Sequence, residues 1–158
     1  MSHVSIIHIS ERISLEIAFC QTFVIIKSSN SQKTSNSMNL LDYLGIQIEE
    51  TTATQVRLSL VVTDQHKQPF GLLHGGINAV LIETACSLGA NQAVAEDQFA
   101  AAIDLQVNHL KAVKQGTVTV EAVPDRIGGK IQTWQATIRQ SDGTKTAVGR
   151  CTLTAVTK

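Results

Sequence analysis

The sequence predicts an α+β domain in which an antiparallel β-sheet is wrapped around one long central α-helix. Two observations lead to this prediction. Apolar residues recur at helical spacing over residues 76–95, and they alternate with polar residues in two segments before that stretch and four after it. An antiparallel sheet with one buried face can form a core against a single helix.

Two strands are expected before the helix. A short helical turn at residues 39–43 ends at Gly45, and apolar residues then alternate with polar ones over 46–48 and 56–60. The helix at 76–95 is about five turns long by the usual rise. Its apolar positions are Ile77, Val80, Leu81, Ala85, Leu88 and Val94.

Four strands are expected after the helix. Their buried positions are predicted to be Ile103, Leu105 and Val107; Val118, Val120 and Ala122; Trp134, Ala136 and Ile138; and, less regularly, Val148, Cys151, Leu153 and Ala155. Turns are expected at Gly116, at 124–129 and at 141–143, where Asp-Gly is a strong hairpin signal. Such a sheet has exposed edges, so pairing with a second copy of the chain is expected.

The domain is expected to span residues 38–158. All ten glycines and both prolines lie after residue 37, and eight of the ten residues in 28–37 are Ser, Asn or Thr, a composition typical of linkers. Residues 1–37 are therefore predicted to be a non-core N-terminal extension, disordered or absent from the native protein if translation starts at Met38. Charged residues interrupt their apolar stretch, so neither a signal peptide nor a membrane span is expected.

Composition excludes several classes of protein. Thirteen basic and thirteen acidic residues leave no net charge, which argues against a nucleic-acid partner. Cys20, Cys86 and Cys151 show neither CxxC nor zinc-site spacing, so no disulfide framework or metal is expected, and Cys86 is interpreted as a core residue. A reducing cytoplasm and no membrane partner fit this pattern.

The helix entrance, residues 68–76, is the first candidate site. Gly75 and Gly76 precede the helix, where free N–H groups and the helix dipole can hold a developing oxyanion. The alternative is a tight strand-to-helix connection without chemistry. The segment lacks the Gly-Lys-Ser/Thr ending of a P-loop and the spacing of a dinucleotide fingerprint.

A polar stripe on the helix is the second candidate. Glu83, Ser87 and Asn91 are spaced four residues apart and so share one face. A carboxylate among apolar helix positions is unfavourable unless it is used or paired. The stripe fits either a solvated face or a site at a subunit interface, and the pattern does not separate the two.

Three histidines are further candidates for chemistry. His109 continues the apolar face of residues 103–107, where it fits either a hydrogen-bonded core residue or a site residue. His66 and His74 do not have the spacing of a helical metal pair, and the pattern offers no third ligand.

Taken together, Gln68, the His74-Gly75-Gly76 run, Glu83, Ser87 and His109 resemble the hotdog-fold acyl-CoA thioesterases. Within that superfamily the motif is most similar to the PaaI-like branch of phenylacetate-pathway, 4-hydroxybenzoyl-CoA and 1,4-dihydroxy-2-naphthoyl-CoA thioesterases. The resemblance covers residues 38–156 and implies a hotdog fold, with an aryl or hydrophobic acyl group as substrate. It also implies homodimers with shared active sites, which can pair into homotetramers.

The resemblance further implies that Glu83 is the catalytic carboxylate, either attacking the thioester carbonyl or activating water. Coenzyme A is then part of the substrate, and no separate cofactor is implied. Near the thioester carbonyl, the resemblance implies that Gly75 N–H holds the oxyanion and that Gln68 and His74 orient the thioester. It implies that Ser87 assists water or the leaving group. The implied substrate contacts are His109, Asn91 and Gly76. The loop with Arg126, Gly128, Gly129 and Lys130 would meet the nucleotide, and Lys111 and Lys114 are weaker candidates. The alternative is that these are ordinary solvated loop charges, which fits Lys111 and Lys114 slightly better.

Two other function classes stay open at this point. A hotdog domain can bind acyl-CoA without hydrolysing it, although such a module has no need of a carboxylate at Glu83. A dehydratase or hydratase acting on acyl thioesters would need an Asp/His pair at its own spacing, which the sequence does not offer. Because all three share a fold, only chemistry at Glu83 separates them.

Overall fold

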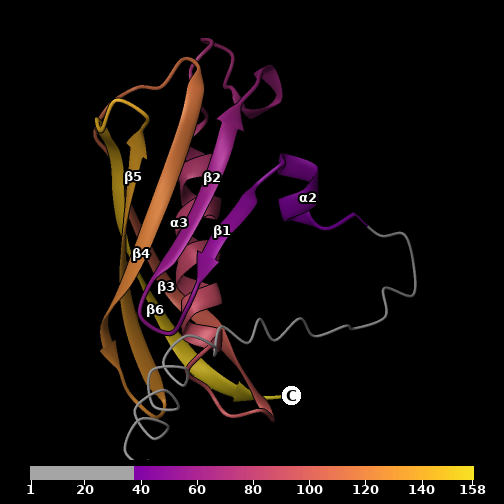
Figure 1. The fold of residues 1–158 in the computed structure, drawn as a ribbon, viewed down its shortest axis with the longest axis vertical. Coiled ribbons are helices and arrows are strands. Elements are labelled where there is room, and N and C mark those ends of the chain that lie inside the picture. The colour runs from indigo at the N-terminus through magenta and orange to yellow at the C-terminus, as the bar shows by residue number, and fades with distance from the viewer. Residues whose placement is uncertain (1–37) are drawn as a thin grey trace, which may run out of the picture. The chain divides into compact units, whose positions relative to one another are not determined.

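One helix lies inside a curved sheet in the computed structural model, which describes residues 38–158 (Figure 1). The predictions for residues 1–37 lie outside this range. The elements are α2 (Leu40–Leu44), β1 (Gln47–Thr51), β2 (Val56–Val62), a 3-10 turn (Asp64–His66), α3 (Gly75–Asn91), β3 (Gln98–His109), β4 (Gly116–Ile127), β5 (Ile131–Gln140) and β6 (Lys145–Thr157).

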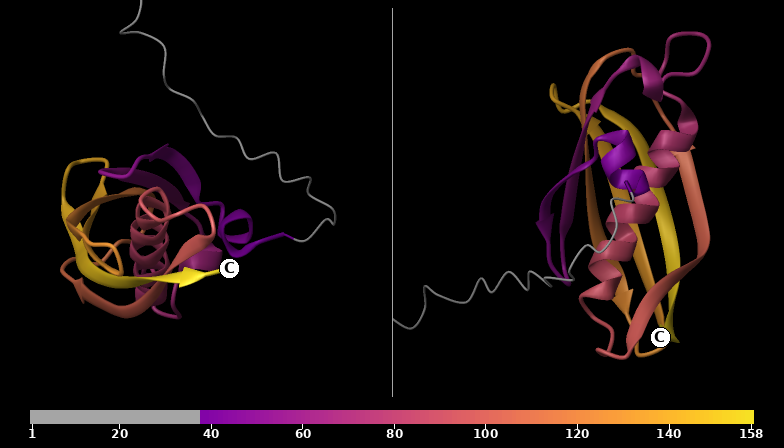
Figure 2. Two further views of the ribbon diagram at one scale, coloured as in Figure 1. Left: turned by 90° about the horizontal axis from the view of Figure 1, so that it is seen from below. Right: turned by 90° about the vertical axis from the view of Figure 1, so that its right-hand side faces the viewer.

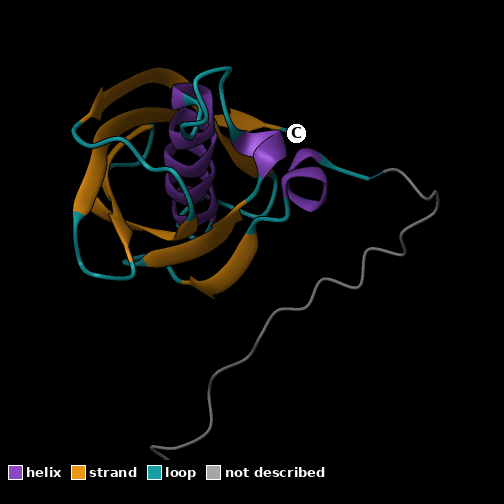
Figure 3. Cartoon of the chain, turned by 90° about the horizontal axis from the view of Figure 1, so that it is seen from above, coloured by secondary structure: helices purple, strands orange, loops and turns teal. Residues whose placement is uncertain are grey.

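The six strands form one antiparallel sheet in the order β1-β2-β4-β5-β6-β3. Seen along the helix, the sheet curls around α3 (Figures 2 and 3). The predicted α+β hotdog fold and its order of elements are therefore confirmed. β1 and β3 are the edge strands. Neither described helix is long and apolar enough to cross a membrane.

The core lies between the inner face of α3 and the concave face of the sheet. Leu81, Ile82, Ala85 and Cys86 are fully buried on the helix, and Trp134 is the largest fully buried side chain of the sheet. A hydrogen bond to Cys151 and burial both raise the pKa of the Cys86 thiol. The interpretation of Cys86 as a core residue is thus confirmed.

Four details of the sequence prediction are wrong. β4 continues to Ile127 through a β-bulge between Pro124 and Arg126, so the turn expected at 124–129 is limited to residues 128–130. α3 ends at Asn91 rather than at residue 95, because the next amides bond three residues back, as in a 3-10 turn. A β-bulge between Ala102 and Asp104 breaks the alternation of β3, so Ile103 is 60% exposed. On β6, Ala147 is fully buried and Val148 is not.

Candidate active site

The start of α3 leaves one backbone donor unused. His74 is the N-cap: its Nδ1 accepts a hydrogen bond from Gly76 N–H at 2.9 Å, and its carbonyl accepts one from Ile77 N–H at 2.9 Å. Within residues 38–158, Gly75 N–H has no hydrogen-bond partner. A free N–H at the positive end of a 17-residue helix can bind an oxyanion or a polarised carbonyl.

Both glycines of the helix entrance lie in close contact with an imidazole ring. A Cβ added at Gly75 would lie 3.0 Å from His109 Nε2, and one at Gly76 would lie 2.9 Å from His74 Nδ1. Neither glycine has a positive φ, so backbone conformation is not the reason for them. The two glycines therefore let two imidazoles approach the helix end, which a plain tight turn would not need.

His109 is the last residue of β3 and points toward the helix start. Its Nδ1 lies 3.1 Å from Nδ2 of Asn78, one turn into α3. Asn78 is only 6% exposed, and its Oδ1 is buried without a hydrogen-bond partner. The sequence analysis missed Asn78, although a polar residue three positions after Gly75 in an apolar helix was a usable signal.

A pocket of about 300 Å³ opens at this helix end. Gly75, Asn78 and His109 line it together with the loops before α3 and after β3, which are joined by a hydrogen bond from Leu73 N–H to the carbonyl of Val113 at 2.7 Å. The complete lining is Gln68, Leu72, Leu73, Gly75, Asn78, His109, Leu110, Lys111, Ala112 and Val113. The lining is mostly apolar and includes one cationic side chain.

Gln68 lies in the tight loop before α3. Its N–H donates to the carbonyl of Leu72 at 2.8 Å, and its Oε1 accepts a hydrogen bond from Phe70 N–H at 3.3 Å. Phe70 at the loop tip is 86% exposed. The structure thus brings together Gln68, Gly75 and His109 of the predicted site, and places His74 and Gly76 beside them.

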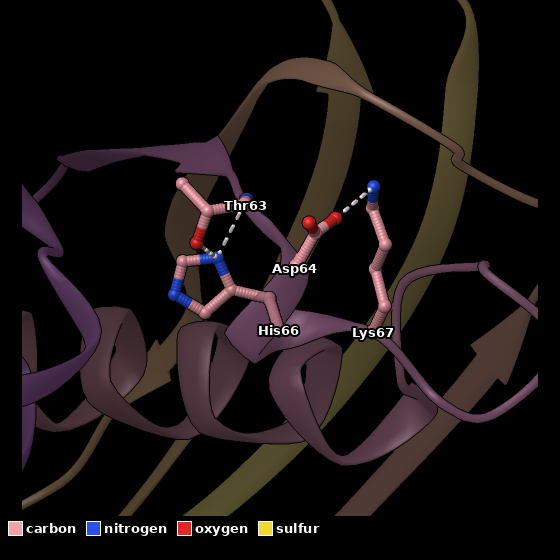
Figure 4. A network of polar contacts seen from close by, with 4 residues as sticks. All are labelled: Thr63, Asp64, His66 and Lys67. Atoms are coloured by element: carbon pink, nitrogen blue, oxygen red, sulfur yellow. Dashed lines mark hydrogen bonds and ion pairs between the residues drawn. The ribbon is translucent and has the colours of Figure 1, made fainter.

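His66 is a structural residue rather than a ligand. It is 2% exposed; its Nδ1 accepts a hydrogen bond from Thr63 N–H at 3.0 Å, and its Nε2 donates to the carbonyl of Leu44 at 2.9 Å. Figure 4 shows the Thr63 contacts beside the exposed Asp64–Lys67 ion pair of 2.8 Å. With both ring nitrogens occupied, His66 ties α2 to the segment before α3. The part of the chain that the structure describes contains no group of three His, Cys, Asp or Glu side chains suited to a metal.

The polar stripe of α3 does not face this pocket within one chain. Glu83 is exposed and lies eight residues beyond Gly75, roughly 12 Å along the helix. Ser87 is partly buried one turn further on. Asn91 has an internal role: its Nδ2 donates to the carbonyl of Ser87 at 2.7 Å, and its Oδ1 accepts from Ala100 N–H at 2.9 Å.

The loop between β4 and β5 lies at the far end of the sheet from the pocket. β4 begins at Gly116 opposite Val62, near the pocket, and runs to Ile127 at the other end (Figure 1). Within one chain, the structure therefore does not bring Arg126, Gly129 or Lys130 to the pocket. A Cβ at Gly128 would lie 2.6 Å from the carbonyl oxygen of Ile131, so the tight hairpin itself requires that glycine.

Comparisons with known proteins agree with this fold. Residues 70–147 match the model of the thioesterase superfamily. The chain is 34% identical over 116 residues to a 1,4-dihydroxy-2-naphthoyl-CoA hydrolase from Listeria monocytogenes, covering 73% of this chain and 94% of the relative. It is 35% identical over 107 residues to 1,4-dihydroxy-2-naphthoyl-CoA thioesterase 2 from Arabidopsis thaliana, covering 67% and 68%.

A solved structure extends the likeness to three dimensions. The crystal structure of a thioesterase from Haemophilus influenzae superposes with a TM-score of 0.72 at 35% identity, covering 78% of this chain and 85% of that chain. The sequence identity, the fold and the length of the match all indicate the same family. This chain belongs to the thioesterase superfamily.

Proposed function

We propose that this protein hydrolyses acyl-CoA thioesters, using Gly75 N–H as the oxyanion donor and Glu83 as the catalytic carboxylate. The observation that carries the proposal is the Gly75 N–H at the start of α3, which is unpaired within residues 38–158 and belongs to a residue that lines a mostly apolar pocket. Such a donor stabilises the negative charge that develops on a carbonyl oxygen under attack.

An aryl or hydrophobic acyl group is the substrate that the pocket favours. Its leucine, alanine and valine side chains offer apolar surface, and Gln68 and His109 supply a small number of polar contacts. Two relatives are named for the thioester of 1,4-dihydroxy-2-naphthoate, an aryl acyl group. Lys111, the cationic side chain in the pocket lining, is available to the phosphates of coenzyme A.

The proposed site requires a second copy of the chain. Because Glu83 lies roughly 12 Å from Gly75 along α3, one chain cannot supply both groups to one carbonyl. The edge strand β3 exposes Phe99 and Ile103 and is available to pair with a copy of itself. In the homodimer, Glu83 and Ser87 of one copy face the Gly75 turn of the other, and pairs of dimers form the homotetramer. Arg126 and Lys130 reach the nucleotide only from a partner copy.

Two routes of hydrolysis are open to Glu83. As a nucleophile, its carboxylate attacks the thioester carbonyl carbon, the C–S bond breaks, coenzyme A leaves as thiolate, and water then cleaves the acyl anhydride. As a general base, it removes a proton from water that attacks the same carbon; the C–S bond then breaks, and the departing coenzyme A thiolate takes up that proton. In both routes the carbonyl oxygen gains charge beside Gly75 N–H.

The test is release of free thiol from a panel of aromatic and aliphatic acyl-CoA thioesters. Wild type is compared with Glu83→Ala and Glu83→Gln, and with Glu49→Ala as a control for loss of an exposed carboxylate. We expect both Glu83 variants to lose about 10³-fold or more in kcat while folding normally, since general bases alone contribute about 10²–10⁴-fold. Equal hydrolysis by the Glu83 variants would refute the role of Glu83.

The same assay addresses the second candidate function, a module that binds acyl-CoA without cleaving it. The exposed carboxylate of Glu83 argues against that function, since a binder gains nothing from a negative charge near a polyanionic ligand. Tight acyl-CoA binding with no thiol release from any thioester in the panel would favour the binding module.

A further inference from the structure

The contact between Asn78 and His109 determines which nitrogen of His109 carries hydrogen. A neutral imidazole has one N–H donor and one acceptor nitrogen. Asn78 presents its Nδ2, a donor, to His109 Nδ1 at 3.1 Å. With Nδ2 as the donor in this contact, Nδ1 is the acceptor and the hydrogen of the neutral ring lies on Nε2.

Nε2 of His109 lies close to the unpaired backbone donor. It is 3.0 Å from the position that a Cβ on Gly75 would occupy, and both residues line the pocket. Gly75 N–H has no hydrogen-bond partner in residues 38–158. The imidazole of His109 and the unpaired backbone N–H of Gly75 therefore belong to the same part of the pocket, at the start of α3.

One atom of the buried Asn78 carboxamide has no hydrogen-bond partner among the described residues. Its Oδ1 is buried without a partner, although burying an unpaired acceptor is unfavourable. Turned over, the carboxamide would give Oδ1 a donor at Nδ1–H but leave Nδ2 unpaired in its place, and the hydrogen of the neutral ring would move to Nδ1. Such unsatisfied groups are rare and are often found at functional sites.

We propose that Asn78 is a positioning residue that holds His109 in its Nε2–H form, so that His109 and Gly75 N–H together bind the carbonyl oxygen of the thioester. The proposal rests on the proposed function, because it takes the carbonyl to lie at Gly75. In it, His109 acts as a second oxyanion donor and not only as a contact for the acyl group.

The first test reads the hydrogen position directly. Nitrogen NMR on isotope-labelled protein distinguishes the two imidazole nitrogens, and the His109→Gln variant assigns the signals. We expect wild type to carry the hydrogen on Nε2 and Asn78→Ala to show a mixture of both tautomers. Hydrogen on Nδ1 in wild type would overturn the proposal, whatever the enzyme's activity.

The second test uses Asn78→Asp, which keeps the size of the side chain but replaces the donor with an acceptor. A carboxylate accepts from Nδ1–H, so neutral His109 loses its hydrogen at Nε2, whereas the imidazolium keeps it. We expect kcat near that of wild type at about pH 6 and a loss of about 10²-fold at about pH 9, with KM changed less than about threefold.

Controls separate this effect from other titrations. Lys111 and His74 are the other cationic or titratable groups near the helix start, and both are unchanged in Asn78→Asp, so wild type supplies their part of the pH profile. When His109 is already replaced by Gln, Asn78→Asp is expected to cause no further pH-dependent change in kcat. The same loss at every pH, with or without His109, would contradict the proposal.

The tests also separate this inference from the proposed function. If wild type cleaves no thioester, the proposed function fails, and the NMR measurement still decides the tautomer. If wild type cleaves thioesters but Asn78→Asp shows a loss that does not depend on pH, only the role of Asn78 fails.

Discussion

Two glycines of the helix α3, Gly75 and Gly89, lie against aromatic rings that belong to strands of the sheet, and the two contacts differ in what surrounds them. At Gly75 the ring is His109, at the pocket, and a Cβ would lie 3.0 Å from its Nε2 atom. At Gly89 the ring is the fully buried Trp134, and a Cβ would lie 2.3 Å from its Cη2 atom.

The side-chain N–H groups at Trp134 have hydrogen-bond partners, whereas two polar groups near His109 have none among the described residues. The Trp134 Nε1–H donates to Gln132 Oε1 at 3.0 Å, and Gln132 Nε2 donates to the carbonyl of Ala90 at 3.1 Å. Near His109, Gly75 N–H and Asn78 Oδ1 have no partner among the described residues. The hydrogen bonds of Trp134 and Gln132 stabilise the fold, whereas the unpaired groups near His109 are available to bind a ligand.

The same substitution at the two glycines is expected to separate activity from stability. Gly75→Ala makes His109 move away from the helix start by a few tenths of an ångström. We expect kcat to fall by about 10-fold, which is less than the loss of about 10²-fold that a misplacement of about 1 Å can cause. The variant's stability should change by less than about 1 kcal/mol, since alanine favours the helix and the ring can move into the pocket. Thiol release and thermal unfolding measure the two effects, and a variant with full activity would contradict the contact.

Gly89→Ala is the matched control, because it makes the same substitution beside Trp134 instead of beside His109. The new methyl group overlaps a ring that is enclosed in the core, and overpacking of this kind costs about 1–3 kcal/mol, with the upper end expected here. Activity per folded molecule should stay near that of wild type at temperatures below the unfolding transition. A urea titration measures the loss, and unchanged stability would show that the core can yield at this point.

Trp134→Phe sharpens the comparison because it removes the ring atoms that Gly89 contacts. It also leaves Gln132 Oε1 without its donor, which we expect to cost about 2 kcal/mol. Combined with Gly89→Ala, the loss should be smaller than the sum of the single losses, since the phenyl ring leaves space for the methyl group. Additive losses in urea unfolding would contradict direct overlap.

Alkylation of Cys86 is expected to give the smallest effect, and it tests whether a reagent can reach the core of the native protein. Its thiol is buried, and the hydrogen bond to Cys151 together with burial raises its pKa, so the reactive thiolate is scarce at neutral pH. An alkylating reagent should label Cys86 only as fast as the protein unfolds, as measured by mass spectrometry of peptides with and without urea. Rapid labelling in the native state would show local opening around Trp134.

Periodicity along the chain was sufficient to predict the fold. The helix and the six strands follow from apolar spacing and turn residues, which act over a few neighbouring positions. Where a strand contains a bulge, as between Ala102 and Asp104, the period fails and the prediction for Ile103 was wrong. The early end of α3 was missed for a similar reason, because a change to 3-10 hydrogen bonding leaves no mark in the apolar pattern.

The sequence by itself determined the order of elements, because local apolar spacing predicts helices and strands. It also determined the family and the residue types of the site, because the His74-Gly75-Gly76 motif indicates them. Tertiary structure decided which of those residues meet. It placed His109 on Gly75, added Asn78 to the pair, and separated both from Glu83 and from the loop at Gly128. The physical reason is that hydrogen-bond partners and close contacts depend on strands and helices that are far apart in the chain, whose distances no local pattern encodes.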